Sequence, residues 1–123
     1  MTSSYGDVPV LDPGVIAELL ESTGGDEEFV RDLVATYVEE GTGLLGGMRD
    51  AVASGDAAAI VRPAHSLKSS SAAIGVMRLS SICRSIEAAG REGRADALGD
   101  AVEEAGAAWT ASLEALQAAG LAP

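Results

Sequence analysis

The sequence predicts an all-α protein, an antiparallel up-and-down four-helix bundle with a short extra N-terminal helix. Apolar residues recur at steps of three and four along most of the chain, and no segment shows the two-residue alternation of a strand. Hydrophobic residues make up 47% of the 123 residues, and alanine dominates them, which favours closely spaced helices. The connections are short, so consecutive helices should be antiparallel neighbours. We predict one domain, with a flexible N-terminal lead over residues 1–10 and the bundle over residues 11–120.

The first two helices are predicted from their capping residues. Asp12, followed by a proline, is typical of a helix N-terminus, so a short helix should run from there to about Ser22. Two glycines end it, and Asp26 can cap a long second helix that extends to about Ser54. Four glycines between residues 41 and 47 disfavour this helix, but its apolar stripe continues in phase across them. The stripe consists of Phe29, Val30, Leu33, Val34, Tyr37, Val38, Leu44, Leu45, Met48 and Val52.

The third helix is expected to carry the single histidine of the chain, His65. Asp56 can cap this helix, which should end at about Ile74 because Gly75 is a good stop signal. Pro63 removes a backbone donor two residues before the histidine. It should therefore kink the helix or mark the start of its regular part.

Two further helices complete the predicted bundle. The fourth segment covers residues 76–89, and a turn follows over residues 90–93. Its apolar positions are Val76, Leu79, Ile82, Cys83 and Ile86. The last helix is expected from residue 95 to about residue 119, with an apolar stripe formed by Leu98, Val102, Ala105, Trp109, Leu113 and Leu116.

The charge of the chain is unevenly distributed. The net charge is −11, which argues against binding of nucleic acid, because phosphate backbones are bound by clustered lysine and arginine. Between Ile60 and Arg94, however, six cations and two acids give a local charge of +4, whereas the rest carries two cations and seventeen acids. The histidine therefore lies on a basic hairpin of an acidic protein. That asymmetry suits a partner with an acidic pocket and an incoming phosphoryl group.

Several other classes of protein are disfavoured. No apolar run approaches the length of a membrane span, and no signal peptide opens the chain. The single cysteine, Cys83, excludes an internal disulfide and fits a reducing cytoplasm. Because Cys83 falls on an apolar stripe, we interpret it as a small buried hydrophobe.

His65 is the main candidate for chemistry. On a helix, Ile60, Ala64, Leu67, Ser71 and Ile74 share the packing face, and His65 points roughly 140° away from it. Small residues, Ser69 and Ala72, share its side, and Lys68 flanks it. An ordinary solvated histidine would fit this placement too. A metal site needs several ligands, which His65 and Cys83 do not supply.

The stretch from Ala64 to Arg91 resembles the signature of histidine-containing phosphotransfer (HPt) domains. That signature is approximately A-H-x-L-K-G-S-S-x-x-x-G, followed by an apolar helix and a closing arginine. The histidine, the lysine three residues later and the glycine ten residues later occur together with helical spacing. The resemblance implies the same bundle that the periodicity predicts. The matching residues are Ala64, His65, Leu67, Lys68, Ser70, Ser71, Gly75, Leu79, Cys83, Ile86 and Arg91.

In that family a receiver domain supplies an aspartyl phosphate and a divalent metal ion, and the phosphoryl group moves reversibly to and from the histidine. The resemblance therefore implies that His65 is the phospho-accepting residue of a two-component phosphorelay protein. Such a protein is a phosphocarrier with no kinase activity and no cofactor or metal of its own. Its partners would be a response-regulator receiver domain, a hybrid histidine kinase, or both. We expect a cytoplasmic monomer that binds neither nucleic acid nor membrane.

Residues around His65 are expected to support this role. Lys68 would stabilise phosphoryl charge. Ser69 stands where the family usually has glycine, which should narrow access to the histidine without abolishing function. Gly75 is the structural glycine of the motif, and Arg91 is its closing arginine.

Glu87 occupies a position that is glutamine in many stand-alone HPt proteins and glutamate in those attached to chemotaxis-type kinases. His65 lies ten residues before Gly75 and Glu87 twelve after it, so the two should face each other across an antiparallel hairpin. We predict a hydrogen bond from His65 Nδ1–H to Glu87. The alternative is a surface acid paired with Arg84 or Arg91.

Two competing functions stay open at this point. The chain could be a non-catalytic helical-bundle interaction module in which His65 is degenerate or incidental. A weaker alternative is a hydrolase that uses Ser69 or Ser70 with His65, although the sequence offers no oxyanion hole or pocket-forming loop. Phosphorylation by a phosphorylated receiver would distinguish these two hypotheses from phosphotransfer.

Overall fold

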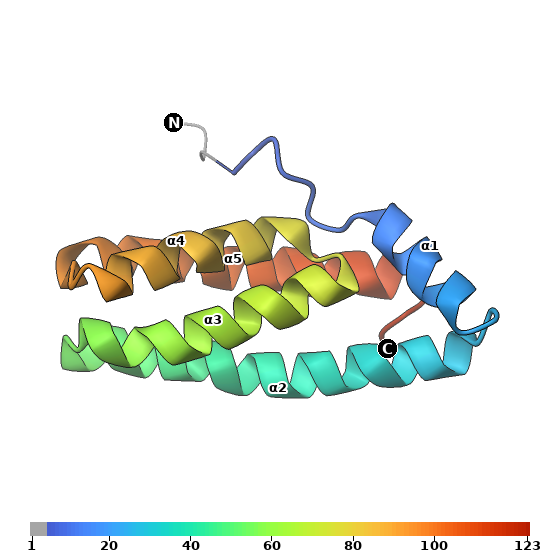
Figure 1. The fold of residues 1–123 in the computed structure, drawn as a ribbon, viewed down its shortest axis with the longest axis horizontal. Helices are drawn as coiled ribbons and strands as arrows, with labels where there is room; N and C mark the ends of the chain where they lie inside the picture. Colours follow the sequence, from blue (N-terminus) through green and yellow to red (C-terminus); the bar gives the residue numbers. More distant parts are fainter. Residues whose placement is uncertain (1–4) are drawn as a thin grey trace.

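The structure is a computed structural model that describes residues 5–123, and this part of the chain is helical with no strand. The predicted bundle and short N-terminal helix are confirmed (Figure 1). The helices are α1 (Pro13–Ser22), α2 (Glu27–Ser54), α3 (Ala57–Ile74), α4 (Met77–Arg91) and α5 (Leu98–Ala118), with a 3-10 turn η1 (Ala95–Ala97) before the last.

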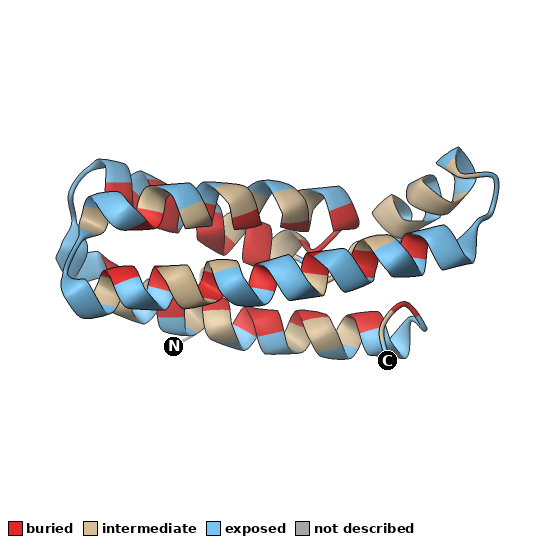
Figure 2. Ribbon diagram, turned by 90° about the horizontal axis from the view of Figure 1, so that it is seen from below, coloured by how far each residue is buried: buried red, intermediate tan, exposed pale blue. Residues whose placement is uncertain are grey.

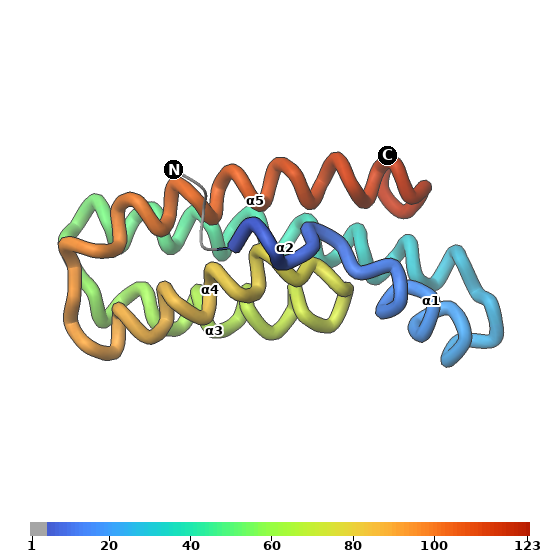
Figure 3. Tube along the Cα trace, turned by 90° about the horizontal axis from the view of Figure 1, so that it is seen from above, coloured from blue at the N-terminus to red at the C-terminus, as the bar shows by residue number. Residues whose placement is uncertain are grey.

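The four long helices form a ring in which each packs against its two neighbours in the order α2, α3, α4 and α5. Viewed from above, α3 and α4 form one side of the bundle and α2 and α5 the other, while α1 lies beside the N-terminal part of α2, beyond the turn between α3 and α4 (Figure 3). The α3–α4 pair has the most extensive contact of any two helices. His65 is therefore carried by the hairpin whose two helices contact each other most extensively.

Side-chain oxygens begin three of the helices as predicted. Asp12 accepts from the backbone N–H of Gly14, Asp26 from Phe29, and Asp56 from Ala59 at 3.1 Å. These bonds satisfy donors that have no partner within the helix.

The predicted apolar stripes form the core, and the buried positions follow the inward side of each of the four long helices (Figure 2). The packing face of α3 is buried at all five predicted positions. All five apolar residues predicted for the fourth segment are buried as well. Phe29 is a correction: its 48% exposure places it outside the core. It lies in the first turn of α2, at the end that extends past α3 and α4.

Two glycines that were interpreted as helix-weakening or turn residues are packing residues. Gly41 lies under Trp109, and a Cβ atom there would come within 2.3 Å of the indole ring. Gly90 was predicted to lie in a turn, but it lies inside α4. A Cβ at Gly90 would meet Ile60 Cγ2 at 2.7 Å and the carbonyl oxygen of Ala57 at 2.9 Å. Gly41 therefore makes room for the indole ring of α5, and Gly90 allows α4 to approach α3 closely.

The third helix begins at Ala57, as the cap at Asp56 predicted. It continues through Pro63, which excludes the alternative that Pro63 marks the start of its regular part. The expected helix from residue 95 begins as η1 and becomes α-helical at Leu98.

The described part of the N-terminal lead runs along α4. Arg78 holds it, because its backbone N–H donates to the carbonyl of Pro9 at 3.0 Å and its Nε–H to that of Val8 at 2.9 Å. Tyr5 is hydrogen-bonded to Ser85 of the same helix. The remaining residues of the expected flexible lead, 1–4, lie outside the described residues.

Candidate functional site

His65 lies on the outer side of α3, as predicted. Its side chain is 56% exposed, while Ala64 and Leu67 on either side of it in sequence are fully buried. The helix is fixed in rotation by this buried face, so the imidazole is held at the surface. A ring held in this way is accessible to a partner molecule.

Glu87 on α4 contacts the imidazole directly, at 3.1 Å between its Oε2 and Nδ1 of His65. The predicted pairing across the hairpin is therefore present. An ionised carboxylate can only accept hydrogen bonds. The contact is consequently a hydrogen bond when Nδ1 carries the proton, and this tautomer leaves the lone pair of Nε2 available.

The alternative interpretation of Glu87, an acid paired with Arg91, is also present in the same cluster. Arg91 Nη2 donates to Oε2 at 2.8 Å, and Lys68 Nζ donates to Oε1 at 2.6 Å. Glu87 is buried, with 9% of its side chain exposed. One buried carboxylate thus binds two cations and the imidazole.

These contacts keep Glu87 ionised. The hydrogen bond from Lys68, followed by that from Arg91, lowers the pKa of Glu87 to about 2, against the opposing effect of burial and with a smaller contribution from His65. The carboxylate therefore remains an acceptor for the imidazole throughout the neutral pH range.

The expectation for Lys68 is modified by this geometry. We expected Lys68 to flank the imidazole and to stabilise phosphoryl charge; in the structure its ammonium group is bound to Glu87, and only 24% of its side chain is exposed. Ser69 is exposed and Ala72 half-buried, so small side chains surround His65 on this side as predicted.

Gly75 ends α3 with a left-handed backbone at φ 89°. A Cβ atom at this position would lie 2.9 Å from Val15 Cβ and 3.0 Å from the carbonyl oxygen of Asp12. The backbone N–H of Asp12 in turn donates to the carbonyl of Gly75 at 2.7 Å. Gly75 therefore allows the turn of the hairpin to contact the segment before α1, which is a structural role.

A shallow depression of about 380 Å³ opens beside the imidazole on the N-terminal side of α3. It is lined by His65, Arg62, Arg91 and the small or apolar residues Ala58 and Val61. The sequence reasoning counted Arg62 in the charge of the hairpin but did not assign it to the site. The available signal was its position one helical turn before His65.

Two arginines of the basic hairpin, which was expected to face a partner, differ in their surroundings. The side chain of Arg78 donates to the N-terminal lead, whereas Arg84 is exposed.

Cys83 is fully buried, and burial raises the pKa of its thiol to about 12, which fits its interpretation as a core residue. Among residues 5–123 no group of three or more histidine, cysteine or acidic side chains could hold a metal ion.

The fold and the site thus define a helical bundle that presents one histidine, backed by a buried acid, on its surface. The family model described as Hpt domain matches residues 32–119, and the chain belongs to this family of histidine-containing phosphotransfer domains. The chain is also similar to the crystal structure of histidine-containing phosphotransfer protein B (HptB) from Pseudomonas aeruginosa PAO1. The two are 27% identical, with a TM-score of 0.78, over 86% of this chain and 90% of that one. No curated protein matches the sequence of this chain.

Membership of the family places the protein in histidine phosphotransfer of two-component signalling. Proteins of this kind are phosphocarriers and not classical enzymes, and they interact with receiver domains and histidine kinases. Within residues 5–123, no helix combines the length and apolar character that crossing a membrane requires.

Proposed function

We propose that this protein carries a phosphoryl group on Nε2 of His65 and exchanges it with the aspartate of a receiver domain. One observation carries the proposal: the exposed imidazole of His65 is hydrogen-bonded through Nδ1 to the ionised, buried carboxylate of Glu87. This arrangement leaves Nε2 as the outward nucleophile and fixes the ring that bears it.

The transfer needs little chemistry from this chain. The lone pair of Nε2 attacks the phosphorus atom of the aspartyl phosphate, a P–N bond forms, and the P–O bond to the aspartate breaks with release of its carboxylate. Positive charge develops on the imidazole as this happens. The Nδ1–H bond to Glu87 stabilises that charge, both in the transition state and in phosphohistidine.

The partner supplies the remaining components. A receiver domain, free-standing or part of a hybrid histidine kinase, provides the aspartate and a divalent metal ion that neutralises phosphoryl charge. The protein itself has no autonomous kinase activity and needs no cofactor. It acts as a monomer in the cytoplasm and binds no nucleic acid.

The proposal is tested with a panel of phosphorylated receiver domains. Wild-type protein should take up phosphate that is labile in acid and stable in base, as expected of phosphohistidine. His65→Gln should take up none while retaining the helical circular dichroism of the wild type. Undiminished labelling of His65→Gln would exclude this histidine. A folded wild type that no receiver labels would favour the interaction module.

A further inference from the structure

We propose that Arg62, together with Arg91, forms a seat that binds the phosphoryl group carried by His65. This inference rests on the proposed function. It assigns to Arg62 the contact with phosphoryl oxygens that sequence reasoning gave to Lys68. Two observations support the inference. A depression opens beside His65, and of the three nearby cations Lys68 and Arg91 are paired with Glu87 whereas Arg62 is not.

The geometry brings Arg62 and His65 to one surface. Residues three apart on a helix are neighbours, with about 5–6 Å between their Cβ atoms. Helical side chains lean toward the N-terminus of the helix, so the imidazole lies over the turn that contains Arg62. Both residues line the depression of about 380 Å³, and Arg91 approaches it from the last turn of α4. Ala58 and Val61 complete its wall and leave room for a small anion.

The charges of the site single out Arg62. Lys68 and Arg91 both donate to the carboxylate of Glu87, which offsets their charge. In the described part of the chain, Arg62 has no ion pair and no side-chain hydrogen bond, and it is exposed. It is therefore the uncompensated cation of the depression.

A phosphoryl group is well matched to this cation. Such a group carries a charge of about −1.5 to −2 near pH 7 and presents three strong acceptor oxygens. The planar guanidinium can donate two parallel N–H bonds to two of these oxygens, which an ammonium group cannot do. Arg91 uses its Nε–H and one Nη2–H for Glu87, so its other N–H groups can face the depression.

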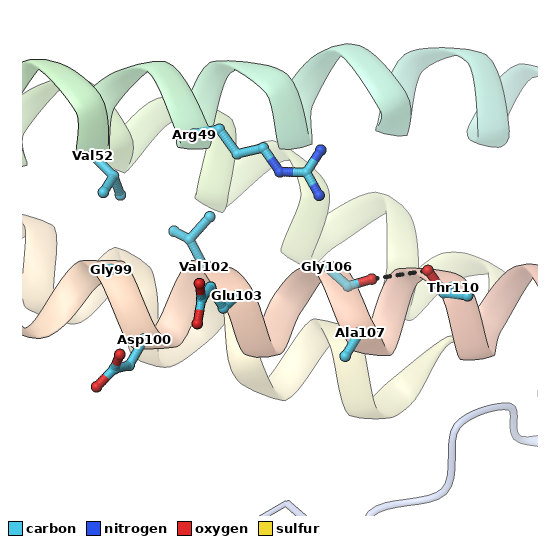
Figure 4. A pocket seen from close by; sticks show the side chains of 9 residues that line it. All are labelled: Arg49, Val52, Gly99, Asp100, Val102, Glu103, Gly106, Ala107 and Thr110. Atoms are coloured by element: carbon cyan, nitrogen blue, oxygen red, sulfur yellow. Dashed lines mark hydrogen bonds between the residues drawn. The ribbon is translucent and has the colours of Figure 1, made fainter.

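Phosphoramidate is a suitable probe, because it phosphorylates histidine without a receiver. Nε2 attacks its phosphorus atom, the P–N bond of the reagent breaks, and ammonia leaves. The variants are Arg62→Ala and Arg62→Lys. The matched control is Arg49→Ala, which removes the same charge from α2, where Arg49 extends toward Gly106 of α5 in a groove on the other side of the bundle (Figure 4).

Arg62→Ala should slow phosphorylation by phosphoramidate about threefold, the size typical of an exposed charge contact. It should also raise the pKa of the phosphoryl group of phosphorylated His65, followed by ³¹P NMR, because a nearby cation favours the more charged form. The cations and acid that face this group are Arg62, Arg91, Lys68 and Glu87. The rate and the pKa of Arg62→Lys should lie between those of wild type and Arg62→Ala. Arg49→Ala should match wild type in both measurements.

Two results would contradict the binding of the phosphoryl group by Arg62 while leaving the proposed function intact. One is a ³¹P titration of Arg62→Ala that coincides with those of wild type and Arg49→Ala. The other is a variant that reacts normally with phosphoramidate and slowly with receivers, which would make Arg62 a docking residue. A folded wild type that gains no phosphohistidine from either donor would instead overturn the proposed function, and the seat with it.

Discussion

Replacing Glu87 with glutamine should make the stability of the bundle less sensitive to acid. The pKa of Glu87 is about 2 in the folded protein, below its ordinary value of 4.5, because Lys68 and Arg91 donate to it. A carboxyl group whose pKa is lowered by folding contributes stability above its unfolded pKa and loses that contribution as the pH falls through its folded pKa. Glutamine does not titrate. The wild type should therefore lose its advantage over Glu87→Gln between about pH 5 and pH 2.

The size of this stability difference depends on how exposed the partners of Glu87 are. A fully shielded carboxylate with this pKa would contribute about 3 kcal/mol. The side chains of Arg91 and His65 are 62% and 56% exposed, however, and exposed ion pairs contribute only about 0.2–1 kcal/mol each. Lys68, at 24% exposed, is the better-shielded partner. We expect Glu87→Gln to lower the free energy of unfolding by about 1 kcal/mol at pH 7.

Urea unfolding followed by circular dichroism, at constant ionic strength from pH 7 to pH 2.5, measures this difference directly. Glu92→Gln is the matched control, because Glu92 is 59% exposed and pairs with Arg94 outside the site. Its difference from wild type should stay close to zero throughout. A Glu87→Gln difference that is independent of pH, or no larger than that of the control, would refute the reasoning. It would mean that the three contacts do not stabilise the ionised carboxylate.

Two further predictions concern the core. Gly41→Ala should lower the free energy of unfolding by about 1–3 kcal/mol, because the added methyl group overlaps the buried ring of Trp109. Gly43→Ala, in open space on the same helix, should raise it by about 0.5–1 kcal/mol. Chemical denaturation measures both differences, and equal effects would contradict the packing argument. Tyr37→Phe should cost about 1–2 kcal/mol, because it leaves the buried hydroxyl of Ser71 without its 2.7 Å partner, and an unchanged melting temperature would show that Ser71 finds another.

The features that were predicted correctly from the sequence depend on interactions within a single helix. Asp12, Asp26 and Asp56 satisfy the first free N–H groups of their own helices, so their position next to an apolar stripe is sufficient to place the helix starts. The buried face of α3 was predictable for a similar reason, since its periodicity is a property of one helix. Because that face fixes the rotation of the helix, the outward direction of His65 followed from it.

The errors came from contacts between helices. Gly41 and Gly90 are visible in the sequence only as poor helix formers, and their role depends on Trp109 and Ile60 on other helices. Phe29 has the spacing of a core residue, but the spacing does not show that α2 extends past its neighbours. Lys68 was placed correctly on α3, yet its partner depends on how closely α4 brings Glu87 to it.

The position of Glu87 also bears on the direction of phosphoryl transfer. Phosphoryl transfer to His65 and its return pass through the same transition state, in which the imidazole carries partial positive charge. This charge is absent from the neutral imidazole and larger still in phosphohistidine that keeps its Nδ1–H, so a group that stabilises it accelerates transfer to His65 and also favours phosphohistidine at equilibrium. Glu87 can do so without reorganisation, because Lys68 and Arg91 already hold it ionised and in place. Glu87→Ala, which removes the acceptor, should therefore slow transfer to His65 and lower the equilibrium fraction of phosphohistidine in rapid-mixing assays. Equal slowing of both directions, with an unchanged equilibrium, would show that Glu87 does not stabilise the charge of the phosphorylated imidazole.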